Sequence, residues 1–168
     1  MGQDVDATMA TMTDDPVVVP VATAVGARGR QAVRDFYATW FIGHQASDMK
    51  LSLSSRTVTA ERVVDEMTIS FTHDTVIPWI LPSVAPTGPR VVVPIVTVIG
   101  MREGLVASEH IYWDQATVLA QVGLIDPEGL PVTGPEQLDT LGQEPDASAF
   151  NALLGSPESG SPPATTVP

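Results

Sequence analysis

The sequence of 168 residues contains no cysteine, and this absence excludes several kinds of site. Without thiols the chain cannot form disulfide bonds, zinc–thiolate centres, iron–sulfur clusters or a cysteine nucleophile. The three histidines form no HxH or HExxH spacing, so we expect no metal site. Proteins without cysteine suit a reducing compartment, and a cytoplasmic location is the expectation.

Positive charge is also scarce. The chain has eight Lys and Arg residues and 20 Asp and Glu residues, which gives a formal net charge of -12. Nucleic acids and anionic membranes both require clustered cations, so we expect neither as a partner. The longest apolar run, residues 91–101, is too short to cross a bilayer. The first 15 residues lack a basic segment followed by an apolar one, so no signal peptide is expected.

Hydrophobic residues make up 43% of the chain, enough for one packed domain. The order of elements predicts an α+β fold, with helices before a set of long antiparallel strands. The sheet should be curved, with the most aromatic helix across its inner face and a pocket between them. Periodicity predicts helices at 4–12, 30–42 and 115–123 and strands at 17–22, 49–59, 62–73, 90–101 and 105–114.

The composition changes near Gly142. Residues 1–142 are expected to form the domain, whereas residues 143–168 are rich in Pro, Ser, Gly and Ala and are expected to be a largely disordered tail. Phe150, Leu153 and Leu154 offer an alternative, a single helical turn that docks on the domain or on a partner.

The helix predicted at residues 30–42 carries an aromatic stripe. Its members recur with the spacing of one helical face and are predicted to pack on the sheet: Val33, Phe36, Tyr37, Trp40 and Phe41. On the strand predicted at 62–73, Asp65 and His73 share a face with apolar residues. They are separated by about 26 Å at strand rise, so they cannot serve one small site, and His73 is the better candidate for a pocket rim.

The segment EHIYWDQ, residues 109–115, concentrates groups that can do chemistry. Strand alternation places Glu109 on the apolar face and His110, Tyr112 and Asp114 on the other, so the pattern favours Glu109 as the carboxylate inside the pocket. A bulge at 112–113 would let Asp114 face inward as well. Two simpler interpretations stay open: Asp114 caps the following helix, or Glu109 forms an ion pair with an arginine such as Arg56 or Arg102.

Several segments together resemble the SnoaL-like branch of the NTF2-like superfamily. They are GRQAVRDFYATWFI, SRTV, RVVDEMTISFTHD, PWILP, PTG and EHIYWDQATVLAQVGLIDPEGLPV, in this order. The resemblance covers about residues 4–135, with its most specific part at 109–123. It implies a cone of N-terminal helices inside a strongly bent sheet, and a homodimer formed through the outer face of the sheet. The family normally has a full helix before the one predicted at 4–12, and this chain begins too late for it.

The resemblance also implies catalysis by an aspartate that acts as general acid/base without metal or cofactor. The position that matches the family's motif is Asp114, which we rank first, and we keep Glu109 beside it because periodicity favours it. The expected function is a cyclase, isomerase or epoxide hydrolase acting on a small apolar molecule, with Tyr112 or His110 stabilising an oxyanion. The expected substrate-binding residues are His73, Trp79, Trp113, Phe36, Trp40 and Phe71.

Three other possibilities accompany this prediction. An epoxide hydrolase needs two aspartates bridged by an arginine, for which Asp65, Asp114 and Arg90 could be proposed. A non-catalytic module for ligand binding or dimerisation would also fit an NTF2-like fold, since fold does not determine function. A structural accessory module would have no pocket at all.

Overall fold

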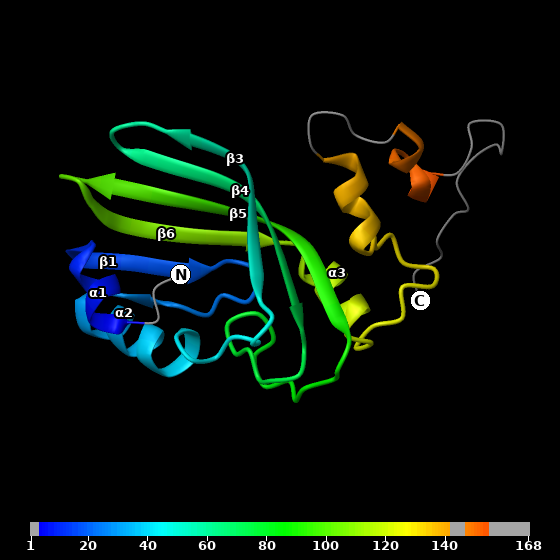
Figure 1. Ribbon diagram of the computed structural model, residues 1–168, viewed down its shortest axis with the longest axis horizontal. Helices are drawn as coiled ribbons and strands as arrows, with labels where there is room; N and C mark the ends of the chain where they lie inside the picture. Colours follow the sequence, from blue (N-terminus) through cyan, green and yellow to red (C-terminus); the bar gives the residue numbers. More distant parts are fainter. Residues whose placement is uncertain (1–3, 142–146, 155–168) are drawn as a thin grey trace, which may run out of the picture.

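The computed structural model describes residues 4–141 and 147–154 and confirms the α+β prediction (Figure 1). N-terminal helices lie against a single six-stranded sheet, and a third helix follows the last strand. The elements are α1 (Val5–Ala10), β1 (Met12–Pro20), β2 (Ala27–Arg28), α2 (Arg30–Phe36), η1 (Tyr37–Phe41), β3 (Lys50–Val58), β4 (Arg62–Thr72), β5 (Arg90–Arg102), β6 (Leu105–Trp113), α3 (Gln115–Gln121), η2 (Pro135–Thr140), η3 (Ala147–Ala149) and η4 (Ala152–Leu154).

The sheet has the strand order β2-β1-β6-β5-β4-β3. Its four long strands from β3 to β6 are joined as antiparallel neighbours, whereas β1 pairs with β6 in parallel, so the sheet is mixed. Figure 1 shows β4 and β5 bending along their length, so that the sheet curves around the side on which α1 and α2 lie. This curvature produces the concave inner face that carries the candidate site.

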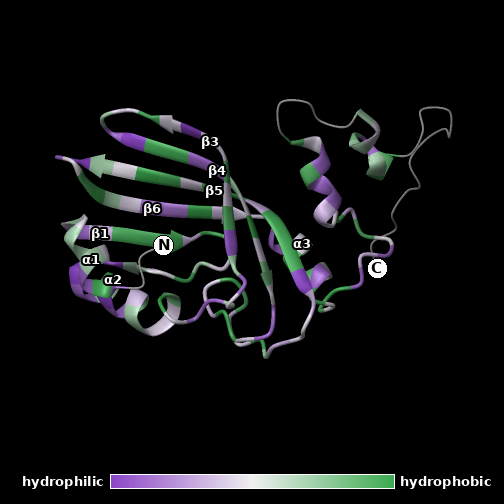
Figure 2. Cartoon of the chain, viewed as in Figure 1, coloured by the Kyte–Doolittle hydropathy of each residue, from purple (hydrophilic) through white to green (hydrophobic). Residues whose placement is uncertain are grey.

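Alternation of apolar and polar residues sets which face each strand turns inward. In β5 every second residue from Val91 to Thr97 is buried, and those between are partly exposed on the outer face. Figure 2 shows bands of hydrophobic and hydrophilic residues along β3, β4 and β6. A turn at Glu103 and Gly104, both with positive φ, joins β5 to β6 as a tight hairpin.

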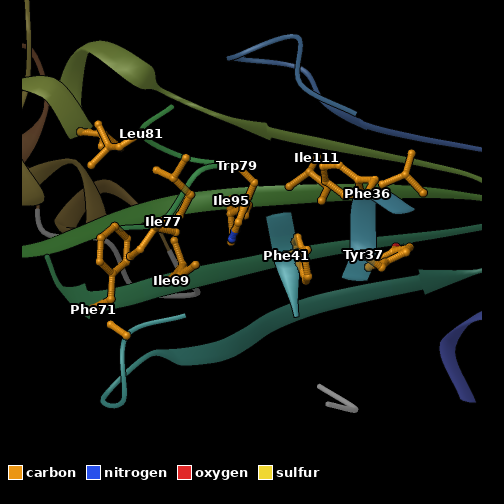
Figure 3. Close-up of a cluster of buried hydrophobic side chains, with 14 of the residues drawn as sticks. Phe36, Tyr37, Phe41, Ile69, Phe71, Ile77, Trp79, Leu81, Ile95 and Ile111 are labelled. Atoms are coloured by element: carbon orange, nitrogen blue, oxygen red, sulfur yellow. The ribbon is translucent and has the colours of Figure 1, made fainter. Parts of the chain in front are cut away.

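The core lies between the inner face of the sheet, the α2–η1 segment and the loop after β4. Figure 3 shows Phe36, Tyr37 and Phe41 on the helical side of this cluster and Ile77, Trp79 and Leu81 contributed by the loop. The ring centroids of Phe41 and Trp79 are 4.9 Å apart, which joins the two parts of the cluster. The residues predicted to line the helix face are therefore mostly core residues.

Trp40 is the exception, because it is 50% exposed. The helix changes from α to π geometry at Tyr37–Phe41, where the N–H of Ile42 donates to the carbonyl of Tyr37 at 2.8 Å. The wider π turn shifts the register, so that Phe41 follows Tyr37 into the core while Trp40 turns toward solvent. The α-helical spacing therefore fails at Trp40, whereas Tyr37 and Phe41 occupy the core as predicted.

Beyond α3 the chain forms short 3-10 turns, which lie at the far end of the molecule in Figure 1. The apolar residues of the tail fall in this part: Phe150 lies between η3 and η4, and Leu154 is 78% exposed. Residues 142–146 and 155–168, most of the predicted tail, lie outside the described residues. The helices of the described part are all too short or too polar to span a bilayer.

Candidate functional site

The register of the three central strands brings the inward-facing residues of β6 opposite those of β5 and β4. Glu109 pairs with Ile99 across the sheet, and Ile111 pairs with Thr97, which in turn pairs with Asp65. Two adjacent rows on the inner face therefore hold two carboxylates, Glu109 in one row and Asp65 in the next. This is the alternation that the sequence predicted for β6.

Two hollows adjoin at Glu109. The first, which we call the Tyr37 hollow, has a volume of about 220 Å³ and the second, the Asp65 hollow, about 190 Å³. Glu109, Phe41 and Ile99 line both hollows. The remaining residues of the Tyr37 hollow are Thr8, Thr11, Met12, Tyr37, Ile42 and Val106. Those of the Asp65 hollow are Leu51, Asp65, Met67, Trp79, Ile95, Thr97 and Ile111.

The carboxylate of Glu109 has a neutral partner. The hydroxyl of Tyr37 donates to Oε2 of Glu109 at 2.7 Å. Burial raises the pKa of Glu109 above its usual value, and the hydrogen bond from Tyr37 offsets part of that rise. Burial, and next the charge and hydrogen bond of Glu109, raise the pKa of Tyr37, so the phenol stays protonated and donates.

The alternative in which Glu109 forms an ion pair with Arg56 or Arg102 is not observed among the described residues. Arg56 instead makes two hydrogen bonds to Asp65, from Nε to Oδ1 and from Nη2 to Oδ2, each at 2.6 Å. A buried carboxylate with a raised pKa and no cationic partner is a stronger base than an ordinary one, whereas the two oxygens of Asp65 are already engaged by a guanidinium. Glu109 is thus the better placed group for acid/base chemistry.

Asp114 lies at the start of α3. Its Oδ1 accepts a hydrogen bond from the backbone N–H of Ala116 at 2.9 Å, and the hydroxyl of Thr117 donates to its Oδ2 at 2.7 Å. The side chain is exposed and lines neither hollow. Asp114 was ranked above Glu109, but no bulge at 112–113 turns its side chain inward, and its carboxylate caps α3 outside both hollows.

The two residues expected to stabilise an oxyanion also lie on the other face. His110 and Tyr112 alternate with Glu109 along β6 and line neither hollow. Tyr112 is 42% exposed, and its ring contacts His110 at a centroid distance of 6.5 Å. The pleat of the strand therefore places both side chains on the opposite face of the sheet from Glu109.

Of the expected substrate-binding residues, Trp79 lines the Asp65 hollow, and the other five line neither of the two hollows. The Nε1 of Trp79 is buried and has no hydrogen-bond partner among the described residues. Trp113 packs edge-on against Trp79 at 5.8 Å, behind the wall of the hollow. Phe36 and Phe71 are core residues with 3% and 0% exposure, so they fill space rather than border it.

His73 is fully buried and lines neither hollow, which corrects its prediction as a rim residue. The N–H of Thr87 donates to Nδ1 of His73, and the carbonyl of His73 accepts hydrogen bonds from Thr87 and Gly88. Burial lowers the pKa of His73, which keeps the ring neutral. The side chain anchors the Pro-rich loop to the end of β4.

The residues considered for an epoxide hydrolase are not brought together. Asp65 is bound by Arg56, Asp114 caps α3, and Arg90 contacts Asp48 at 3.6 Å and the hydroxyl of Ser70 at 3.0 Å. In residues 4–141 and 147–154, no three His, Asp or Glu side chains are grouped as they would be around a metal ion.

Tyr37 was placed on the aromatic stripe from sequence but was not recognised as the partner of Glu109. The two residues are 72 positions apart, and only the tertiary fold joins them. One signal was present: a tyrosine on a buried helix face needs an acceptor for its hydroxyl, and Glu109 was the carboxylate that alternation turned toward that face.

Comparison with solved structures places this arrangement in the NTF2-like fold. A protein with a ketosteroid isomerase-like fold from Catenulispora acidiphila, in complex with trimethylamine, is 21% identical with a TM-score of 0.55, over 74% of this chain and 85% of that one. A candidate SnoaL-like polyketide cyclase from Jannaschia sp. CCS1 is 20% identical with a TM-score of 0.57. The likeness covers 73% of this chain and 80% of that one. An NTF2-like protein of unknown function from Burkholderia pseudomallei is 17% identical with a TM-score of 0.53. The likeness covers 71% of this chain and 86% of that one.

At these identities the structural likeness defines the fold and not the activity. No curated protein matches the chain significantly in sequence. The family match covers α1 to the middle of β6 and ends at Glu109, so it does not include the segment 110–135 of the resemblance. Residues 2–109 match the model of the SnoaL-like domain, and the chain therefore belongs to the SnoaL-like family.

Proposed function

We propose that the protein is a cofactor-independent enzyme that uses Glu109 as general acid/base on a small, largely apolar molecule. The observation that carries this proposal is a carboxylate with a raised pKa that borders two hollows and has a neutral tyrosine as its hydrogen-bond partner. Perturbed titratable groups in pockets are characteristic of catalytic sites.

In the proposed reaction the ionised Glu109 accepts a proton from a carbon next to a carbonyl, or from a water molecule that attacks an epoxide. The protonated carboxyl then returns that proton to the product, so the site is restored without an external acid. Tyr37 keeps its own proton and holds the carboxylate in position through the hydrogen bond to Oε2. A pKa closer to neutral makes the carboxylate a more effective base at physiological pH.

The test uses two probes of suitable size, because cyclases and isomerases begin on a carbon acid and epoxide hydrolases on water. Exchange of the α-protons of 2-tetralone is followed in D₂O by NMR, and hydrolysis of indene oxide by chromatography. We expect the wild type to accelerate at least one reaction and Glu109→Gln to lower that rate by about 100-fold or more. Rates equal to buffer for both probes would contradict the proposal.

A non-catalytic ligand-binding module is the alternative, and the hollows would serve it equally well. It predicts that Glu109→Gln binds apolar ligands as the wild type does and that neither protein changes them. Binding without turnover across both probes would therefore favour the module over the enzyme.

We also propose that the protein is a homodimer formed through the outer face of the sheet. Val92, Val96 and Val98 lie on that face of β5, only partly buried, and Tyr112 extends the apolar surface onto β6. Analytical ultracentrifugation at micromolar concentration should give a dimer, and Val96→Asp should give a monomer. A monomeric wild type would refute this part of the proposal.

A further inference from the structure

The Asp65 hollow contains a carboxylate that the proposed reaction does not use. Asp65 is only 4% exposed and lines the hollow from β4. Its partner Arg56 lies directly opposite on the edge strand β3, and 53% of the arginine side chain is exposed. The guanidinium therefore reaches in from the rim, while the carboxylate forms part of the wall.

The Asp65 carboxylate retains unused hydrogen-bonding capacity. A carboxylate offers about four lone-pair sites on two oxygens, and Arg56 occupies one site on each oxygen. No other side chain in the described ranges donates to Asp65. Thr97 lies directly opposite on β5, lines the same hollow, and its hydroxyl makes no hydrogen bond to a described residue. Two unused polar groups thus lie side by side on a mainly apolar wall.

The charges at this position restrict what can bind there. Asp65 and Arg56 are paired and offset each other's charge, so the pair presents no unpaired charge to attract an ion at this position. A neutral donor needs no charged partner, and it satisfies the remaining lone pairs of a carboxylate that is costly to bury. We propose that Asp65, held by Arg56 and assisted by Thr97, forms a subsite for a hydroxyl group, so that the substrate is an alcohol or phenol on an otherwise apolar ring system.

The position of this subsite sets its distance from the reacting group. Asp65 and Glu109 are separated by two strand spacings and two residues along the strand, or about 12 Å between Cα atoms. Both side chains point to the concave face, which brings their ends closer. A fused bicyclic molecule spans such a gap, with its hydroxyl on Asp65 and its reacting carbon beside Glu109. This inference deepens the proposed function. It rests on that proposal only for the placement of the reacting carbon beside Glu109, and not for the hydroxyl subsite itself.

The test compares 5-indanol with indane, which differ only in the hydroxyl. Isothermal titration calorimetry should show that the wild type binds 5-indanol about tenfold or more tightly than indane, as expected for a hydrogen bond to a charged acceptor. The Arg56 Nε–H resonance in NMR should move on saturation with 5-indanol and stay in place with indane, because the ligand shares the carboxylate that Nε contacts.

The variants separate the subsite from general effects. Asp65→Val should remove the preference for 5-indanol and leave the affinity for indane unchanged within about twofold. The matched control is Glu66→Val, since Glu66 is the next residue on β4 and is exposed on the opposite face. It should keep the preference. Asp65→Val removes one member of a buried ion pair and can unfold the chain. If it does, the response of the Arg56 resonance to 5-indanol in the wild-type protein decides whether the subsite exists.

Three results would overturn the subsite. They are equal affinity for 5-indanol and indane, no binding of either probe at millimolar concentration, and an Arg56 resonance that does not move when 5-indanol is bound. These outcomes differ from a failure of the proposed function. If the preference depends on Asp65 while Glu109→Gln leaves probe turnover unchanged, the subsite stands and the catalytic proposal fails. If Glu109→Gln abolishes turnover while 5-indanol and indane bind equally, the catalytic proposal stands and the subsite fails.

Discussion

The two acids at the end of β6 lie five positions apart and occupy opposite environments. Glu109 projects from the concave face into two hollows and has a tyrosine as partner, whereas Asp114 is exposed and caps α3. The chemical group is the same in both, so the difference comes from the face of the strand and from what binds the carboxylate. A match to a family motif in sequence therefore does not by itself place a residue in a pocket.

The largest expected effect separates the two acids by activity. Glu109→Gln should reduce probe turnover by about 100-fold or more, whereas Asp114→Asn should stay within about threefold of wild type. Both changes are isosteric, so each serves as the control for the other, with folding checked by circular dichroism. Equal losses in both variants would break the comparison and restore Asp114 as a catalytic candidate.

Stability should show the opposite order. Asp114→Ala removes the acceptor for the Ala116 N–H and should cost about 1 kcal/mol of unfolding free energy. Glu109→Gln should unfold in denaturant at the same or a higher midpoint at pH 8. Because the pKa of Glu109 is raised in the folded state, its contribution to stability is present below the unfolded value of 4.5 and is lost as pH rises through the folded value. A large destabilisation by Glu109→Gln at pH 8 would argue that Glu109 is structural.

The smallest effect sharpens the role of Tyr37. Its hydrogen bond lowers the pKa of Glu109 relative to burial alone, so Tyr37→Phe should raise that pKa further. The acidic limb of the pH–rate profile should then move to higher pH, since a base must lose its proton before it acts. Tyr37→Phe with an unshifted limb and only a lower rate would show that the tyrosine merely packs.

Local patterns predicted much of this molecule from sequence. Alternation along residues 105–113 turned Glu109 inward, and the position of Asp114 before an apolar helix gave its cap as one interpretation. Both follow from spacing over a few residues. Weighting the family motif above them put first an acid that the fold places outside both hollows.

The errors arose where geometry depends on distant residues. Trp40 left the stripe because a π turn changed the register, and no spacing rule indicates such a turn. His73 was expected at a rim but is covered by the loop that it anchors. The contacts of Tyr37 with Glu109 and of Arg56 with Asp65 required knowledge of the helix position and of the register between strands.

The central claim is that Glu109 titrates in an apolar environment at the junction of the two hollows. A direct measurement is the pH titration of its side-chain carboxyl carbon by ¹³C NMR in the wild-type protein, with the resonance assigned from Glu109→Gln. The account predicts a pKa clearly above 4.5 that rises further in Tyr37→Phe. A value at or below 4.5, or one that Tyr37→Phe leaves unchanged, would contradict it.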